Sequence, residues 1–206
     1  MPETVDCFYT LSSPWMYLGG PRLADMIRRH GARLVLRPYD FLEVVPDNGG
    51  IPLRTRPLAR QEYHALELDR WSAALGLPLN LRPRFYPPSD QRPAGRMVMA
   101  AQAQGLDAMR LSHALLRALW VEERDIALPE TRAAIASENG MDGAALLTAE
   151  DTPATMAEWG ANNAAATARG VFGSPTFFSG DLWIWGQDRL HFLDEHLGQR
   201  RREHAA

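Results

Sequence analysis

The residues best suited to active-site chemistry lie in short segments, and the first of these surrounds Ser13. Residues 11–18 read Leu-Ser-Ser-Pro-Trp-Met-Tyr-Leu, so Ser13 stands before a proline at the expected start of a helix. Unpaired backbone N–H groups and the helix dipole favour negative charge there, and thiols at helix N-termini have a lowered pKa. The Ser13 hydroxyl could therefore donate a hydrogen bond to a bound thiolate. A plain helix N-cap, the commonest use of serine before a helix, is the alternative.

The second segment, residues 170–177, reads Gly-Val-Phe-Gly-Ser-Pro-Thr-Phe and leads directly into an expected strand. If the bond between Ser174 and Pro175 is cis, the N–H and C=O of Ser174 are left to pair with an extended peptide. An ordinary trans turn into an edge strand fits the same residues.

The third segment, Trp-Gly-Gln-Asp-Arg-Leu at residues 185–190, opens the last expected helix. Asp188 could accept a hydrogen bond from a ligand ammonium group, with Gln187 beside it. The alternative is structural, because an acidic residue in the first turn of a helix suits the helix dipole.

Several other chemistries are excluded by residue type. The single cysteine, Cys7, allows no internal disulfide, no Cys-x-x-Cys pair and no cysteine-based zinc site. It lies within an expected strand and is predicted to be a small buried residue. All 22 basic residues other than histidine are arginines, so no lysine can form a Schiff base or a P-loop contact. His191 and His196 are five residues apart and do not share a helix face, so we predict no metal site.

The composition is that of an ordinary folded domain of 206 residues, with 46% hydrophobic and 23% charged residues. The formal net charge of −3 gives no basic surplus for nucleic acid, and no nucleic-acid partner is expected. The apolar runs are too short to span a bilayer, so we expect no membrane partner. No basic segment followed by an apolar one stands at the N-terminus, and a cytoplasmic protein is therefore expected.

These segments need elements that position them, and the first part of the chain predicts a βαβ unit. Residues 5–11 form an apolar run rich in strand formers, and a helix is expected from Pro14 to about His30, ended by Gly31. Residues 34–36 predict a second, parallel strand. A loop is expected at residues 45–56, which contain several prolines and glycines.

The rest of the chain predicts a helical block and then a hairpin. Helices are expected at 58–75, within 93–148, and from 153 to about 169. Two short strands, 176–179 and 182–185, flank Gly180-Asp181, which is a hairpin signal. A final helix is expected at 187–197, followed by a frayed tail at 199–206.

This order of elements, βαβ, helices and then ββα, predicts an α/β protein with a thioredoxin-like fold and an α-helical insertion. The thioredoxin-like domain would be discontinuous, with residues 1–50 and 165–206 on either side of an insertion at 51–164.

Taken together and in this order, the three segments resemble the 2-hydroxychromene-2-carboxylate isomerase family. That family is similar to the kappa-class glutathione transferases and, more distantly, to DsbA-type disulfide oxidoreductases. The resemblance covers nearly the whole chain. It implies a thioredoxin fold of the DsbA and kappa-transferase type, glutathione as the cofactor, a small-molecule substrate from aromatic degradation, and a homodimer.

The resemblance also assigns roles to residues. It implies that Ser13 is the catalytic serine that hydrogen-bonds the glutathione sulfur, and that Ser174, before Pro175, pairs with the cysteinyl backbone of glutathione. The γ-glutamyl end would be held by Trp185, Gly186, Gln187 and Asp188. The second cysteine position of the oxidoreductases is Met16 here, and Ser-x-x-Met cannot cycle through a disulfide.

On the substrate side, the chain departs from the family. The lysine that contacts the substrate in naphthalene-pathway isomerases is absent, and Glu43, Val44 and Val45 occupy that region. Arg54 or Arg56 is the expected replacement, since arginine suits a bidentate carboxylate contact. Tyr86 and Trp15 are further candidates for substrate contacts.

The activity implied is a glutathione-dependent cis-trans isomerisation. In it, a thiolate adds reversibly to an unsaturated aromatic keto acid. Two alternatives use the same site. One is a kappa-like transferase that conjugates glutathione to an electrophile, and the other is a non-catalytic protein that binds a thiol or a peptide.

Overall fold

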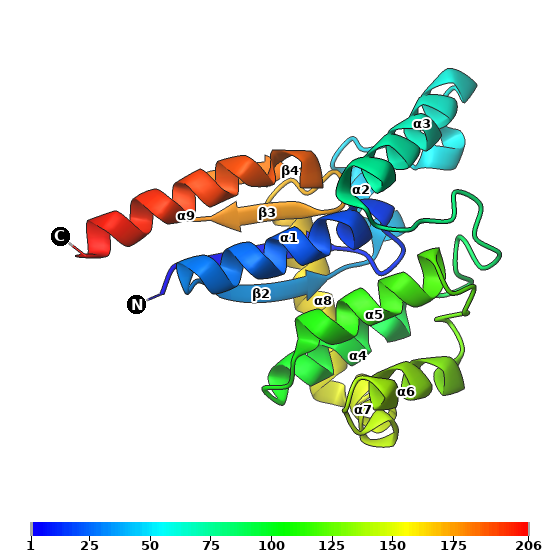
Figure 1. Ribbon diagram of the computed structural model, residues 1–206. Helices are drawn as coiled ribbons and strands as arrows, with labels where there is room; N and C mark the ends of the chain where they lie inside the picture. Colours follow the sequence, from blue (N-terminus) through cyan, green and yellow to red (C-terminus); the bar gives the residue numbers. More distant parts are fainter. Residues whose placement is uncertain (1, 206) are drawn as a thin grey trace.

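The computed structural model describes residues 2–205, and its centre is a four-stranded mixed sheet (Figure 1). The strands are β1 (Thr4–Tyr9), β2 (Arg33–Pro38), β3 (Thr176–Ser179) and β4 (Leu182–Trp185). Their order in the sheet is β2-β1-β3-β4; β1 is parallel to β2, and β3 is antiparallel to β1 and to β4. The predicted βαβ unit and the predicted hairpin are therefore both confirmed.

Helix α1 (Pro14–His30) connects the two parallel strands, and local sequence signals fix both of its ends. The Ser13 side chain accepts a hydrogen bond from the Met16 N–H, and Pro14 occupies the first turn. Gly31 ends the helix in the left-handed conformation with φ 63°, as its sequence position predicts. Ser13 is thus held at the point where the buried strand β1 becomes a helix.

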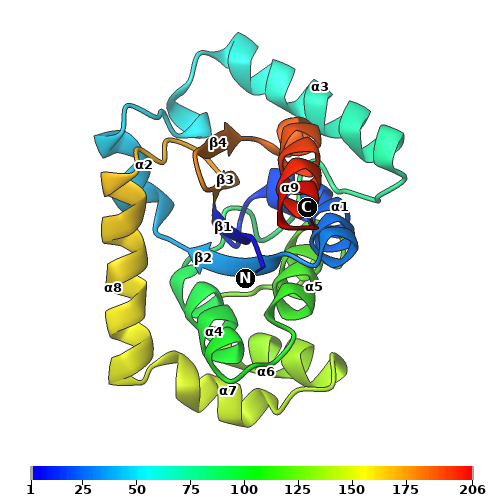
Figure 2. The ribbon, with the colours of Figure 1, turned by 90° about the vertical axis from the view of Figure 1, so that its left-hand side faces the viewer.

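Helices cover both faces of the sheet (Figure 2). Val5, Cys7 and Tyr9 of β1 belong to the larger apolar core, which they share with buried residues of α1 and of α9 (Leu190–Ala205). Phe8 points to the other face and packs in a smaller core with residues of α2 and α8. Strand β1 therefore contacts an apolar core on each of its two faces.

The helical block follows β2 and precedes β3 in the chain. Its helices are α2 (Phe41–Asp47), the 3-10 turn η1 (Leu53–Thr55), α3 (Leu58–Leu75), α4 (Arg92–Ala103), α5 (Ala108–Trp120), α6 (Pro129–Glu138), α7 (Gly143–Glu150) and α8 (Pro153–Ala168). Figures 1 and 2 show α3 at the opposite end of the molecule from α6 and α7. The predicted domain limit at 164/165 falls within α8.

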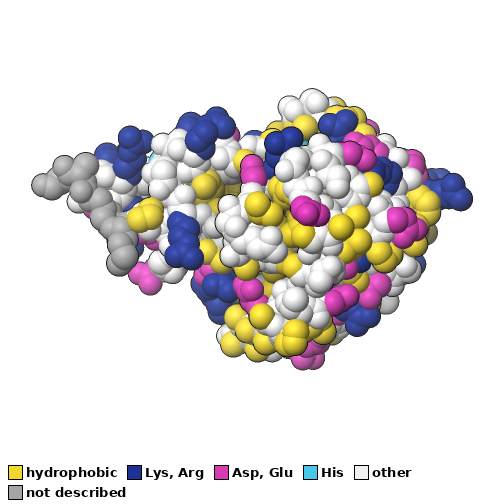
Figure 3. All heavy atoms as spheres, turned by 90° about the horizontal axis from the view of Figure 1, so that it is seen from below, with side chains coloured by type: hydrophobic (Ala, Val, Ile, Leu, Met, Phe, Trp, Pro, Cys, Tyr) yellow, Lys and Arg dark blue, Asp and Glu magenta, His cyan; other side chains and the backbone are white. Residues whose placement is uncertain are grey.

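On the face that includes α6 and α7, acidic and basic side chains are interspersed with apolar ones (Figure 3). This mixture agrees with the small net charge of −3. Within residues 2–205, no helix has the length and apolar character needed to cross a membrane.

Two sequence predictions about irregular structure are wrong. The segment 45–56 is not a continuous loop, because α2 runs to Asp47 and η1 forms a 3-10 turn within the same segment. The end of the chain is not frayed over its described part, since α9 continues to Ala205. Arg201 donates a hydrogen bond from this helix to the carbonyl of Arg29 at 3.0 Å, a contact between ends of the chain that local sequence cannot reveal. Residue 206 lies outside the described residues.

Close packing of α1 against the turn before α9 gives a stability prediction. A Cβ atom on buried Gly19 would lie 2.7 Å from Cβ of Gln187, so Gly19→Ala should lower the free energy of unfolding by about 1–3 kcal/mol. Exposed Gly160 in α8 has open space around it, and Gly160→Ala should stabilise the protein by up to about 1 kcal/mol. Urea unfolding measures both; equal effects of the two substitutions would contradict the packing.

Candidate active site

The start of α1 and the segment before β3 meet through their serines. The Ser13 hydroxyl accepts from the Met16 N–H at 3.2 Å and donates to the Ser174 carbonyl at 3.2 Å. The Thr10 N–H donates in turn to the Ser174 hydroxyl at 3.0 Å. Ser13 is therefore an N-cap, and its hydroxyl hydrogen is at the same time directed at the second predicted segment.

The Ser174–Pro175 peptide bond is cis, one of the two alternatives left open by the sequence. The carbonyl of Pro175 accepts from the Gly186 N–H at 2.9 Å, which ties this loop to the end of β4. The N–H of Ser174 has no hydrogen-bond partner among residues 2–205. A ligand backbone that approached Ser174 would thus meet an unpaired N–H and a carbonyl that only Ser13 engages.

These serines lie in a cavity of about 830 Å³, a volume typical of small-molecule sites. The cavity is bounded by the start of α1, by α2, by the segment from η1 into α3, by residues 86–92 and by residues 173–174. Seven predicted site residues line it together: Ser13, Trp15, Arg54, Arg56, Tyr86, Ser174 and Trp185. The structure thus brings together residues from both ends of the chain and from the helical block.

The other predicted site residues do not line this cavity. Gln187 is buried and directed toward α1, where Arg22 donates to its side-chain oxygen and, at 2.9 Å, to its carbonyl. Asp188 pairs with Arg189 at 3.1 Å on the surface. Gly186 has a φ of 93° at the turn that joins Trp185 to Gln187 and Asp188. Gln187 therefore supports this turn from behind, and the ligand contacts predicted for residues 186–188 and Pro175 remain predictions.

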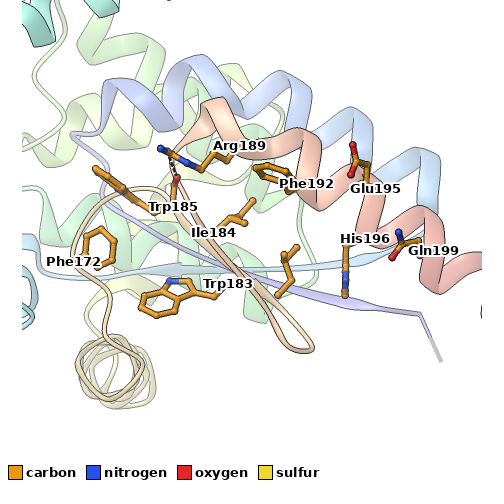
Figure 4. Close-up of a pocket in the computed structure, with 10 residues that line it drawn as sticks. Phe172, Trp183, Ile184, Trp185, Arg189, Phe192, Glu195, His196 and Gln199 are labelled. Atoms are coloured by element: carbon orange, nitrogen blue, oxygen red, sulfur yellow. Dashed lines mark hydrogen bonds between the residues drawn. The ribbon is translucent and has the colours of Figure 1, made fainter.

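Trp185 is the wall between the cavity and a second, open groove (Figure 4). The groove runs between β4 and α9, with Phe172 and Trp183 at one end and Phe192 further along α9. The Arg189 guanidinium donates to the Trp185 carbonyl at 3.0 Å. A Cβ atom on Gly173 would lie 2.2 Å from Nε1 of Trp185, so only glycine fits beneath the indole.

Among the arginines that line the cavity, Arg54 differs because its guanidinium has no partner within the described part of the chain. Arg56 donates from Nε to the carbonyl of Ile51 at 2.7 Å, and Arg92 pairs with Asp90 at 2.9 Å. The Arg54 guanidinium has no hydrogen bond or ion pair with any described residue. It lies near Tyr86, whose pKa is raised by burial and lowered in part by the charge of Arg54. Arg54 is thus available for an anion.

His64 lines the cavity from α3, and no sequence pattern points to this residue. The Trp15 indole N–H donates to His64 Nε2 at 3.1 Å, and the two rings meet edge to face. Burial, reinforced by the charge of Arg56, lowers the pKa of His64 to about 4, so the ring is neutral near pH 7. Trp15 and His64 are 49 residues apart, and no local pattern connects them. Within residues 2–205, no group of His, Cys, Asp and Glu residues is arranged for a metal ion.

Comparison with known proteins identifies the family. The DSBA-like thioredoxin domain family matches residues 4–198. A 2-hydroxychromene-2-carboxylate isomerase of Sphingobium xenophagum is 32% identical over 203 residues, which cover 96% of this chain and 99% of the relative. The chain belongs to the 2-hydroxychromene-2-carboxylate isomerase family of DSBA-like proteins.

Two further matches extend this family assignment. A solved structure of a 2-hydroxychromene-2-carboxylate isomerase superposes with a TM-score of 0.81 at 27% identity, covering 98% of both chains. Human glutathione S-transferase kappa 1 is 26% identical, over 97% of this chain and 92% of its own length. The predicted DsbA-type thioredoxin fold with a helical insertion is therefore confirmed.

The lowered pKa of His64 gives a pH prediction. Between pH 6.5 and about 4, the unfolded chain binds a proton at His64 and the folded protein does not, so the free energy of unfolding should fall as the pH is lowered through this range. His64→Gln should make that fall shallower. His191→Gln, at an exposed site on α9, should leave it unchanged. Urea unfolding across the range measures the slopes, and equal slopes in all three proteins would refute the assignment.

Proposed function

We propose that this protein is a glutathione-dependent cis-trans isomerase of unsaturated aromatic keto acids of the 2-hydroxychromene-2-carboxylate type. The single observation that carries the proposal is the pairing of Ser13 with Ser174 in one cavity, at the N-terminus of α1. Relatives named as 2-hydroxychromene-2-carboxylate isomerases support the substrate class.

The residues of the cavity fit glutathione. A thiol has to come from a ligand, because Cys7, the chain's single cysteine, is fully buried with its Sγ 3.9 Å from Met16 Sδ. The unpaired N–H and the carbonyl of Ser174 suit the backbone of a peptide ligand. When bound, glutathione would supply the thiolate that adds reversibly to the unsaturated keto acid.

Ser13 would stabilise that negative charge by exchanging partners. Its hydroxyl now donates to the Ser174 carbonyl, and turning this hydrogen toward a sulfur would release that carbonyl to accept from a ligand N–H. The Ser13 oxygen would still accept from the Met16 N–H, so the helix cap would be retained. The N-terminal N–H groups of α1 would add to the stabilisation of the anion.

The substrate would be held by residues from the helical block. The Arg54 guanidinium, which has no hydrogen bond or ion pair among residues 2–205, would bind the carboxylate, and the Tyr86 hydroxyl would donate to the neighbouring keto oxygen. Burial raises the pKa of Tyr86, so its hydroxyl keeps its proton near neutral pH. The Trp15 indole would form an apolar wall for the aromatic ring.

The γ-glutamyl contacts, the homodimer and the cytoplasmic location belong to the same proposal. Trp185 and Asp188 would contact the γ-glutamyl end, with Gly186 and the buried Gln187 shaping the turn between them. Sedimentation of the purified protein tests the homodimer.

Replacing Ser13 should separate thiolate stabilisation from binding. With Ser13→Ala, the rate should fall about a hundredfold, as for loss of one donor to a developing anion, and the pKa of bound glutathione should rise toward its free-solution value. Thiolate absorbance titration and keto-acid turnover measure the two effects. Ser12→Ala is the matched control, because Ser12 lines the same cavity without capping α1. An unchanged thiol pKa in Ser13→Ala would exclude the assigned role of Ser13.

Arg54→Met should raise the KM of keto-acid substrates about ten- to a hundredfold, since one charge-assisted hydrogen-bonded contact is lost. Arg60→Met, at an exposed position of α3, should have no effect. Glutathione affinity, measured by calorimetry, should be equal in both variants. If Arg54→Met weakened glutathione binding and left the keto-acid KM unchanged, Arg54 would belong to the cofactor site.

Conjugation of glutathione to an electrophile is the second candidate, favoured by the similarity to human glutathione S-transferase kappa 1. Mass spectrometry of the product separates the two activities. An isomer keeps the mass of the substrate, whereas a conjugate gains that of glutathione.

A further inference from the structure

We propose that His64 determines specificity by donating a hydrogen bond to an oxygen substituent on the aromatic ring of the substrate. This role deepens the proposed function and rests on it. Neither the sequence patterns nor the family assignment points to His64, which enters the site only through the geometry of α3 and α1.

The first support is the direction of the His64 hydrogen bonds. Nε2 accepts from the Trp15 indole N–H at 3.1 Å, so the proton of the neutral ring is on Nδ1. Nδ1 has no hydrogen-bond partner among residues 2–205 and is not among the fully buried polar atoms. His64 lines the cavity, and we infer that this accessible N–H faces it.

The second support is that His64 remains an uncharged donor in its surroundings. Arg56 and Arg54 line the same cavity, and burial together with the Arg56 charge opposes protonation of the imidazole. Trp15 also requires Nε2 to stay unprotonated. A fixed neutral donor recognises an oxygen without demanding a second negative charge on the substrate.

The third support is the arrangement of the other groups. Arg54 and Tyr86 are close enough for the charge of the arginine to affect the pKa of the tyrosine, and they suit the keto-acid end. Trp15 supplies an aromatic surface, and its indole nitrogen fixes His64 beside that surface. A 2-hydroxychromene that opens its ring has a hydroxyl group ortho to the side chain. The His64 N–H would pair with this oxygen.

Such a donor discriminates because a ring without the oxygen excludes water from the donor and leaves it unpaired. One neutral hydrogen bond corresponds to about a tenfold difference in affinity, and rejection is greater where the site is dry. The free-energy cost of the unpaired N–H applies to the ligand that lacks the hydroxyl. The contacts of the aromatic ring with the cavity are the same for both ligands.

The experiment measures binding without glutathione and without turnover. The probes are ortho-hydroxycinnamate and cinnamate, which differ only in the ring hydroxyl. Isothermal calorimetry on the wild type should show about tenfold tighter binding of the hydroxylated probe. His64→Leu should remove this preference by weakening that probe alone. His64→Gln, whose amide can accept from Trp15 and still donate, should keep the preference and controls for loss of folding.

His191→Leu, on the exposed surface of α9, is the matched histidine control and should behave as the wild type. A wild type with no preference, a preference that survives in His64→Leu, or equal weakening of both probes would overturn the proposal. The proposal would also be overturned if neither probe bound to the wild type at millimolar concentration.

Turnover then separates this proposal from the function on which it rests. With glutathione present, His64→Leu should reduce kcat/KM about tenfold for an ortho-hydroxybenzylidene keto acid and less than about threefold for its analogue without the hydroxyl. If the wild type isomerises neither compound while its binding preference is intact, the isomerase proposal fails and the His64 assignment stands.

Discussion

The hydrogen bond from the Ser13 hydroxyl to the Ser174 carbonyl joins segments that are 161 residues apart in the chain. It can form because β1 and β3 are antiparallel neighbours with Phe8 opposite Thr176, so the exit of one strand lies beside the entry to the other. The chain enters the helical block and returns from it at this end of the strands. The cavity lies at this place, and its lining includes residues that follow β1 and residues that precede β3.

Around this contact, most polar groups of the cavity are already engaged by the protein. Asp40 caps α2 through the Leu42 N–H at 3.0 Å, and Glu43 accepts from Asn163 at 2.9 Å. Arg92 is neutralised by Asp90. The donors and cations that the described residues leave for a ligand include the Ser174 N–H and the Arg54 guanidinium. The Tyr86 hydroxyl and the His64 Nδ1–H are also without a hydrogen-bond partner there. These groups offer hydrogen bonds or positive charge, and such a set suits an anion and a carboxylate.

Local signals in the sequence predict most of the fold. The N-cap at Ser13, the glycine that ends α1 and the Gly180-Asp181 hairpin act over a few residues, and all are found in the structure. The contacts of Arg201 with Arg29 and of Trp15 with His64 join distant parts of the chain and have no local pattern. The contact of the buried Gln187 side chain with Arg22 is a further example of a long-range contact without a local pattern.

The protonation states of the groups that line the cavity distinguish the two candidate reactions. Conjugation by addition requires a proton to be delivered to a substrate carbon, whereas reversible addition and departure of a thiolate require none overall. Burial raises the pKa of Tyr86, and His64 is neutral with Nε2 bonded to Trp15, so both hold their protons near neutral pH. Asp90 is kept ionised by Arg92, whose hydrogen bond lowers the pKa of that carboxyl. Under the proposed function, a site that stabilises negative charge by hydrogen bonds without giving up a proton would favour departure of the thiolate over conjugation by addition.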